Sequence, residues 1–223
     1  MSDTDSFIEE VTEEVRRDRL FMLFKRYAWV AVTLIVLIVG GASWNEYRKA
    51  QNRAAAEKLG DEIIAALAAN EPAGRSVALT GIEVESPGGA AVLNFLTAAT
   101  SAEAGQTNDA VVALNDIAAN GELPEIYRQI ATFKALTLQA DSLSANDRRI
   151  QFEALAQPGA PLRLLAQEQL ALIDISEGNR DAAVDRLQDI LQDAESTPDL
   201  QQRATQVIVA LGGTPQALPG SQG

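Results

Sequence analysis

The sequence contains no cysteine and no histidine among its 223 residues. The absence of cysteine excludes disulfides and thiolate nucleophiles, and the absence of both residue types excludes zinc sites of the usual kind. Without histidine, the chain also lacks the commonest general base near neutral pH. A chain without cysteine is compatible with every redox compartment, so this absence does not locate the protein.

Motifs that carry catalysis are missing as well. Neighbouring carboxylates such as Asp61 and Glu62 point in different directions on a helix and are usually solvated. The pair Gly212 and Gly213 follows a predicted helix instead of opening one, so it does not form a phosphate-binding loop. No serine stands in a Gly-x-Ser-x-Gly elbow. We therefore expect no enzyme, no cofactor, no metal site and no small-molecule substrate.

Basic side chains are scarce, with 18 Lys and Arg against 31 Asp and Glu, which gives a net charge of −13. The imbalance lies mostly in residues 46–223, which carry thirteen basic and twenty-four acidic side chains. Such a segment repels phosphate groups, and it contains no basic stripe with interleaved aromatic residues. Nucleic acid is therefore not an expected partner.

What the sequence does contain is one long apolar run, residues 27–45, without Asp, Glu, Lys or Arg. As a helix this run would span about 28 Å, close to the roughly 30 Å hydrocarbon core of a bilayer. We therefore predict a transmembrane helix. The alternative is a cleaved signal peptide, but the leader before the run is 26 residues long and mostly acidic. Aromatic residues near the two ends are predicted to lie at the membrane interfaces: Tyr27, Trp29, Trp44 and Tyr47.

The orientation of this span follows from the Lys and Arg residues beside it. Five precede the span and four follow it closely, so the positive-inside rule gives only a slight bias. A short leader that stays inside, one span and a large translocated domain is nonetheless the simplest insertion. In a bacterium, the N-terminus would be cytoplasmic and the C-terminal domain would lie outside the cytoplasm.

The segments beside the span have distinct compositions. Residues 1–26 form a leader with apolar residues at roughly helical spacing, which predicts a short helix that either docks a cytosolic partner or rests on the inner leaflet. Residues 46–89 form a helical extension and a connector. Within the connector, Val77–Val84 fits a helix or a strand, and we prefer a helix because no other segment offers a strand partner. Residues 213–223 are predicted to be disordered.

Residues 90–212 alternate between helices and short breaks. Gly105, Asn120-Gly121 and Gly178 are predicted to end helices, and Pro124, Pro161 and Pro198 stand where the next helix would begin. Two breaks share the spacing Gly-x4-Ala-x3-Leu, at residues 105–114 and 178–187. This spacing is typical of the tetratricopeptide helical hairpin, in which the small residue lets two helices approach. We therefore predict an all-α fold, a single transmembrane helix followed by a tetratricopeptide-like helical-hairpin solenoid. An irregular helical bundle is the alternative.

The first helices of the hairpins support the same register. Ala98, Ala131 and Ala171 can occupy the small position, at separations of 33 and 40 residues against an expected period of about 34. The middle copy is therefore expected to carry an insertion near Ser142 to Arg148. Stacked hairpins leave a curved groove. The register makes five residues candidates for the groove or its rim: Phe95, Arg128, Thr132, Arg163 and Glu168. A core position for Phe95, and a surface pair or cap for Arg163 and Glu168, are the alternatives.

With these features the chain resembles the single-pass, tetratricopeptide-like proteins of the bacterial inner membrane described as ancillary subunits of the Sec translocon. The resemblance covers most of the chain and rests on the leader, the lone span, the helix that leaves it and the hairpin repeats. It is strongest in residues 158–171, 178–183 and 202–212, which look like the C-terminal signature of the alphaproteobacterial members. It implies an inner-membrane protein with a periplasmic domain that associates with the export channel and with membrane-anchored periplasmic chaperones.

The function that the resemblance implies is a membrane-tethered scaffold that assists the hand-over of exported proteins from the Sec translocon to periplasmic chaperones. An alternative is a coordinator of envelope assembly or cell division that uses the same repeats to bind peptidoglycan-synthesis proteins. A more remote alternative is a soluble substrate-binding module released by processing.

Overall fold

A computed structural model describes residues 3–216, with side chains described for residues 29, 30 and 32–216. Over residues 3–216 the chain forms nine α-helices and no strand, which confirms the prediction of an all-α fold. The chain divides into two compact units, Met1–Lys58 and Leu59–Gly223. The predicted disordered tail falls mainly on residues 217–223, which lie outside the described residues.

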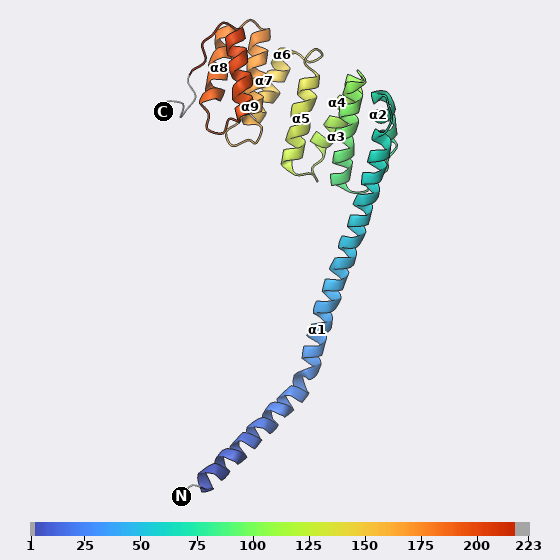
Figure 1. The fold of residues 1–223 in the computed structure, drawn as a ribbon, viewed down its shortest axis with the longest axis vertical. Coiled ribbons are helices and arrows are strands. Elements are labelled where there is room, and N and C mark those ends of the chain that lie inside the picture. Colours follow the sequence, from blue (N-terminus) through green and yellow to red (C-terminus); the bar gives the residue numbers. More distant parts are fainter. Residues whose placement is uncertain (1–2, 217–223) are drawn as a thin grey trace. The chain divides into compact units, whose positions relative to one another are not determined.

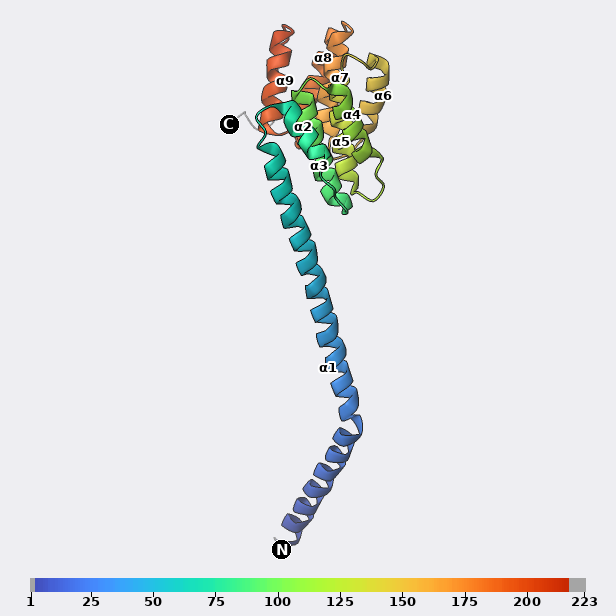
Figure 2. The same cartoon turned by 90° about the vertical axis from the view of Figure 1, so that its right-hand side faces the viewer.

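The first helix, α1, runs from Asp3 to Leu67, so the leader, the apolar run and the extension after it share one helix (Figure 2). The large apolar side chains described between Val30 and Val39 are 44–67% exposed. Trp29, Trp44 and Tyr47 are exposed as well, whereas the side chain of Tyr27 lies outside the described residues. Among the described residues, no helix combines the length and the apolar character needed to cross a membrane.

The second compact unit begins within the last turns of α1. Ile63 and Leu67 pack with Leu79 of α2 (Pro72–Thr80) and Leu93 of α3 (Pro87–Glu103). Gly89 of α3 also approaches α1 closely, because a Cβ atom there would lie 2.9 Å from Cδ2 of Leu59. The compact unit therefore starts before residue 90, where we placed the start of the repeat domain, because the end of α1 supplies part of its core.

The connector predicted within residues 46–89 contains α2, which ends at Thr80, and residues 82–85 belong to no helix. We predicted a helix for Val77–Val84. The structure has a helix up to Thr80 and none over the last residues of this segment. A buried hydroxyl pair ties α2 to α3, with Oγ of Ser76 and Oγ of Ser101 only 2.7 Å apart. Each hydroxyl thereby satisfies the other away from water.

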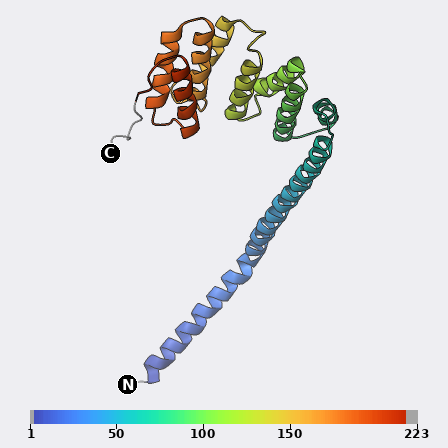
Figure 3. The ribbon, with the colours of Figure 1, turned by 45° about the horizontal axis from the view of Figure 1, so that its top comes forward.

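Six further helices follow, and each packs against the next along the chain, while α3 also contacts α5 (Figures 1 and 3). Packing that is confined to near neighbours is characteristic of helical repeats. The helices are α4 (Thr107–Ala119), α5 (Glu125–Leu138), α6 (Ala145–Leu155), α7 (Arg163–Ser176), α8 (Arg180–Gln192) and α9 (Pro198–Ala210).

The breaks between helices follow the predicted chemistry. Gly105 and Gly178 stand just after α3 and α7 with φ of 75° and 81°, a conformation that residues with a Cβ rarely adopt. Proline opens helices because its fixed φ is compatible with the first turn and its missing N–H costs nothing there. Pro198 is the first residue of α9, and Pro124 directly precedes α5.

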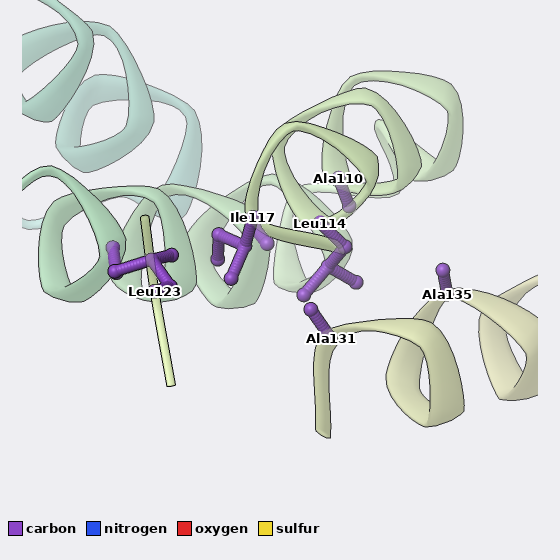
Figure 4. Close-up of a cluster of buried hydrophobic side chains, with 8 residues drawn as sticks. Ala110, Leu114, Ile117, Leu123, Ala131 and Ala135 are labelled. Atoms are coloured by element: carbon purple, nitrogen blue, oxygen red, sulfur yellow. The ribbon is translucent and has the colours of Figure 1, made fainter. Parts of the chain in front are cut away.

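The core confirms that the Gly-x4-Ala-x3-Leu spacing marks close helix packing. In the first copy Ala110 and Leu114 are buried, and Leu114 points toward Ala131 of α5 (Figure 4). In the second copy Ala183 and Leu187 are buried in a cluster formed by α7, α8 and α9. The same two residue types therefore fill the same role in α4 and α8.

The middle hairpin departs from this arrangement. Residues 139–144 form the turn before α6, so the extra chain length overlaps the predicted insertion near Ser142 to Arg148 without matching its bounds. Phe152 and Leu155 of α6 are buried and lie three residues apart, as do Leu114 and Ile117 of α4. The residue four positions before Leu114 is Ala110, whereas the residue four positions before Phe152 is Arg148. A long side chain thus replaces the alanine, and α5 and α6 pack less extensively than α3 and α4.

Candidate functional site

An apolar pocket of about 260 Å³ lies where the first turns of α3, the turn after α4 and the start of α5 meet. Val92 and Tyr127 are half exposed in its wall, at 50% and 45%, whereas Phe95 packs partly against the core beneath. The lining consists of Pro87, Gly88, Ala91, Val92, Phe95, Glu122, Leu123, Pro124 and Tyr127.

The turn between α4 and α5 holds one wall of the pocket in place. The side-chain Oδ1 of Asn120 accepts a hydrogen bond from the N–H of Glu122 at 3.0 Å, and the Asn120 carbonyl accepts one from Leu123 at 3.2 Å. Leu123 is only 5% exposed and anchors the turn in the core of α3, α4 and α5 (Figure 4). The wall is therefore fixed by backbone and side-chain contacts before any partner binds.

The lining of this pocket contains one charged residue, which is acidic, and Arg128 directly follows the lining residue Tyr127 in α5. Glu122 is the only Asp, Glu, Lys or Arg residue in the lining. Between Ser76 and Tyr127 the sequence contains no Lys or Arg, and it contains seven acidic residues: Glu83, Glu85, Glu103, Asp109, Asp116, Glu122 and Glu125. Of these, Glu103 forms an ion pair with Arg75 at 2.9 Å. The pocket thus combines apolar walls with one acidic residue, Glu122.

The structure separates the five predicted groove residues. Phe95 lines the pocket and also contributes to the core, so both roles considered for it apply. Thr132 uses its hydroxyl within α5, where Oγ1 donates to the carbonyl of Arg128 at 2.9 Å. The Nε atom of Arg128 is buried and has no hydrogen-bond partner among the described residues.

Arg163 and Glu168 are engaged in ion pairs with distant parts of the chain. Arg163 donates from Nη1 to Oδ2 of Asp193 at 2.8 Å and from Nη2 to Oε2 of Glu195 at 2.7 Å. These hydrogen bonds raise the pKa of Arg163, and the bond from Arg163 lowers the pKa of Asp193. Glu168 accepts two hydrogen bonds from Arg203 of α9, at 2.7 and 2.9 Å, which raise the pKa of Arg203. Both residues therefore tie α7 to its neighbours.

A buried ion-pair network around Asp174 was not predicted. Asp174 of α7 is 3% exposed, and its carboxylate accepts from Nη2 of Arg149 at 2.7 Å and from Nε of Arg186 at 3.2 Å. Arg149 also bonds Glu177 at 2.6 Å, and these carboxylates, Asp174 first, raise the pKa of Arg149. The sequence did contain a signal for this network. Asp174 lies four residues after Leu170, on the same face of the helix, where an apolar residue would be expected.

The described residues contain no group of three or more Asp or Glu side chains placed to hold a metal ion. No known protein-family model, no curated protein and no solved structure matches the chain.

Proposed function

We propose that residues 59–216 form a tetratricopeptide-like solenoid whose task is to bind other proteins. The observation that carries this proposal is the shared burial of Ala110 with Leu114 and of Ala183 with Leu187, in hairpins that pack against their neighbours. Repeats of this kind bury a continuous core and present an extended surface to partners. The apolar pocket beside Phe95 gives that surface one defined attachment point.

The second part of the proposal is that residues 27–45 of α1 lie in a lipid bilayer. The support is the row of large side chains from Val30 to Val39, which are 44–67% exposed. Contiguous exposed apolar surface marks a contact with lipid or with another protein. No charged residue interrupts residues 27–45, and Arg48 and Lys49 follow within one turn. In the proposed topology the leader is cytoplasmic and the helical unit is periplasmic.

The proposed role is a scaffold of the bacterial inner membrane that associates with the Sec translocon and helps exported proteins reach periplasmic chaperones. Its support is the combination of a short leader, an exposed apolar helix segment and a helical-repeat unit, together with the resemblance described above. The exposed walls of the pocket, Val92 and Tyr127, add a surface suited to a peptide segment.

Site-specific photo-cross-linking in intact cells tests this role. The cross-linker replaces Val92 or Tyr127 at the pocket, Leu172 on α7 and, as a control on another helix, Val112 on α4, all of which are exposed. We expect adducts with subunits of the Sec channel or with a membrane-anchored chaperone. Adducts dominated by peptidoglycan synthases would support the envelope-assembly alternative instead. Neither class of adduct from Val92, Tyr127 or Leu172 would refute both roles.

A separate measurement addresses the anchor. We expect the full chain to remain with membranes after alkaline extraction and to keep its original N-terminus in intact-mass analysis. A soluble, N-terminally shortened product would contradict the anchor and favour the processed soluble module.

A further inference from the structure

We infer that the pocket between α3 and α5 receives one large apolar side chain from a positively charged peptide segment. This inference rests on the proposed function in one respect, that the helical unit binds proteins. It adds the chemical class of the bound segment, which is a Phe or Leu anchor flanked by Lys or Arg.

The size and lining of the pocket fit a side chain better than a whole small molecule. Sites for drug-sized ligands occupy about 300–1,000 Å³, whereas this pocket measures about 260 Å³. A dry apolar cavity of about 150 Å³ already accommodates benzene, so the pocket holds one aromatic or branched side chain with its neighbouring backbone. Val92, Phe95 and Tyr127 supply apolar and aromatic contacts on two sides.

The charge around the pocket selects the residues that flank the anchor. Glu122 stands in the lining, and Glu125 follows in the first turn of α5. A Lys or Arg beside the anchor would approach these carboxylates, whereas an acidic residue would be repelled by them.

A negatively charged ligand is the alternative to a positively charged segment, because α3 and α5 both begin at the pocket. The N-terminus of a helix attracts anions through its free N–H groups. Here the N–H of Gly89 already bonds Oγ of Ser86 at 3.2 Å, and the N–H of Ala90 bonds the Ser86 carbonyl at 2.9 Å. Glu125 lies in the first turn of α5, where its charge offsets the helix dipole. Cationic segments are therefore favoured over acidic ones.

Binding of designed peptides to the full-length protein tests the inference. The protein is reconstituted in nanodiscs of neutral phosphatidylcholine, and empty nanodiscs measure any peptide that binds lipid. Three fluorescent ten-residue probes are compared: one Phe flanked by Lys, the same peptide with Ala for Phe, and the same peptide with Glu for Lys. We expect saturable binding of the first probe below about 1 mM. The Ala probe should bind about tenfold or more weakly, because the buried anchor is lost.

Two pairs of variants locate the site. Val92→Lys places a charge in the pocket wall and should weaken the first probe about tenfold or more, whereas Val112→Lys, at a similarly exposed valine of α4, should leave binding unchanged. Glu122→Lys should weaken binding about three- to tenfold. Asp116→Lys changes the net charge equally at an exposed position of α4 and should have a smaller effect. Circular dichroism and thermal unfolding confirm that each variant is folded.

The results separate this inference from the broader function. Equal binding of all three probes, tighter binding of the Glu probe, or equal loss in Val92→Lys and Val112→Lys would each overturn the inference. No saturable binding of the Phe and Lys probe would overturn it as well. If cross-linking in cells still yields export components from Leu172 under those outcomes, the scaffold role stands and only the pocket assignment fails.

Discussion

Replacing Asp174 by Asn should destabilise the helical unit more than any exchange of an exposed charge. The substitution keeps the side-chain volume but removes the negative charge that faces Arg149 at 2.7 Å and Arg186 at 3.2 Å. It also places an amide donor against two guanidinium donors. Asp174 is 3% exposed, so water cannot readily replace the lost interactions.

The magnitude follows from the burial of the three groups. Hydrogen bonds to charged groups contribute about 1.5–3 kcal/mol each, and breaking a fully buried pair costs about 3–5 kcal/mol. The side chains of Arg149 and Arg186 remain 22% and 29% exposed and regain part of their hydration. We therefore expect a loss of about 3 kcal/mol. For a unit of this size that loss lowers the Tm by roughly 6–12 °C.

Far-ultraviolet circular dichroism at 222 nm during urea and thermal unfolding measures this change. Tryptophan fluorescence does not serve, because both tryptophans, Trp29 and Trp44, lie in α1 before Leu59. Glu168→Gln is the matched control on α7, since its partner Arg203 is 47% exposed, and it should cost about 1 kcal/mol or less. A free energy of unfolding for Asp174→Asn within about 0.5 kcal/mol of the parent would refute the reasoning.

Three other predictions concern the helical unit. Ala183→Leu should destabilise it by about 1–3 kcal/mol in the same unfolding assay, because Ala183 is fully buried between helices, whereas Ala182→Leu, at an exposed position, should change stability little. Gly178→Ala should cost about 1 kcal/mol because φ is 81° there, and an unchanged urea midpoint would contradict this. Because folding lowers the pKa of Asp193, the stability that its carboxylate contributes is present above the ordinary pKa of 3.8. This stability is lost as the pH falls through the lower pKa of the folded state. The difference in Tm between the parent and Asp193→Asn should therefore be constant from pH 5 to 7 and shrink below about pH 4; a difference independent of pH down to 2 would count against the pair with Arg163.

The sequence was sufficient to predict the two regular hairpins because their signals are local. Gly178 marks the end of α7, and Ala183 with Leu187 marks the face of α8 that packs against it. All three residues lie within ten positions, and the spacing of the α-helix alone places Ala183 and Leu187 on one face. The same reasoning applied to residues 105–114 identified α4 and its buried face.

The spacing of residues within one helix could not predict contacts between segments that are distant in the sequence. Arg163 was a candidate for the groove, yet it pairs with Asp193 and Glu195, about thirty positions later in the sequence. Glu168 likewise pairs with Arg203 across a separation of 35 residues. The pocket itself was not predicted, and Phe95 is the only one of its lining residues that was a groove candidate. Its other walls come from the ends of helices, where a periodic pattern carries no information about neighbours.

The middle hairpin shows why a missing motif is informative. Arg148 stands where α4 and α8 have alanine, so no small residue signals the approach of α6 to α5. These two helices also pack less extensively than α3 and α4, which agrees with the absence of a small residue at this position. The Nε atom of Arg148 is buried without a hydrogen-bond partner among the described residues.

The distribution of charge bears on how the helical unit could be held at a membrane. Residues 1–58 contain nine basic and nine acidic side chains, whereas residues 59–223 contain nine basic and twenty-two acidic ones, so the whole net charge of −13 belongs to the second unit. Five of its basic residues form ion pairs inside the unit: Arg75, Arg149, Arg163, Arg186 and Arg203. A surface of this sign is repelled by anionic lipid headgroups, so adsorption of the unit to a bilayer is disfavoured. In the proposed topology, residues 27–45, with Arg48 and Lys49 beside them, would supply the membrane affinity that the acidic unit lacks.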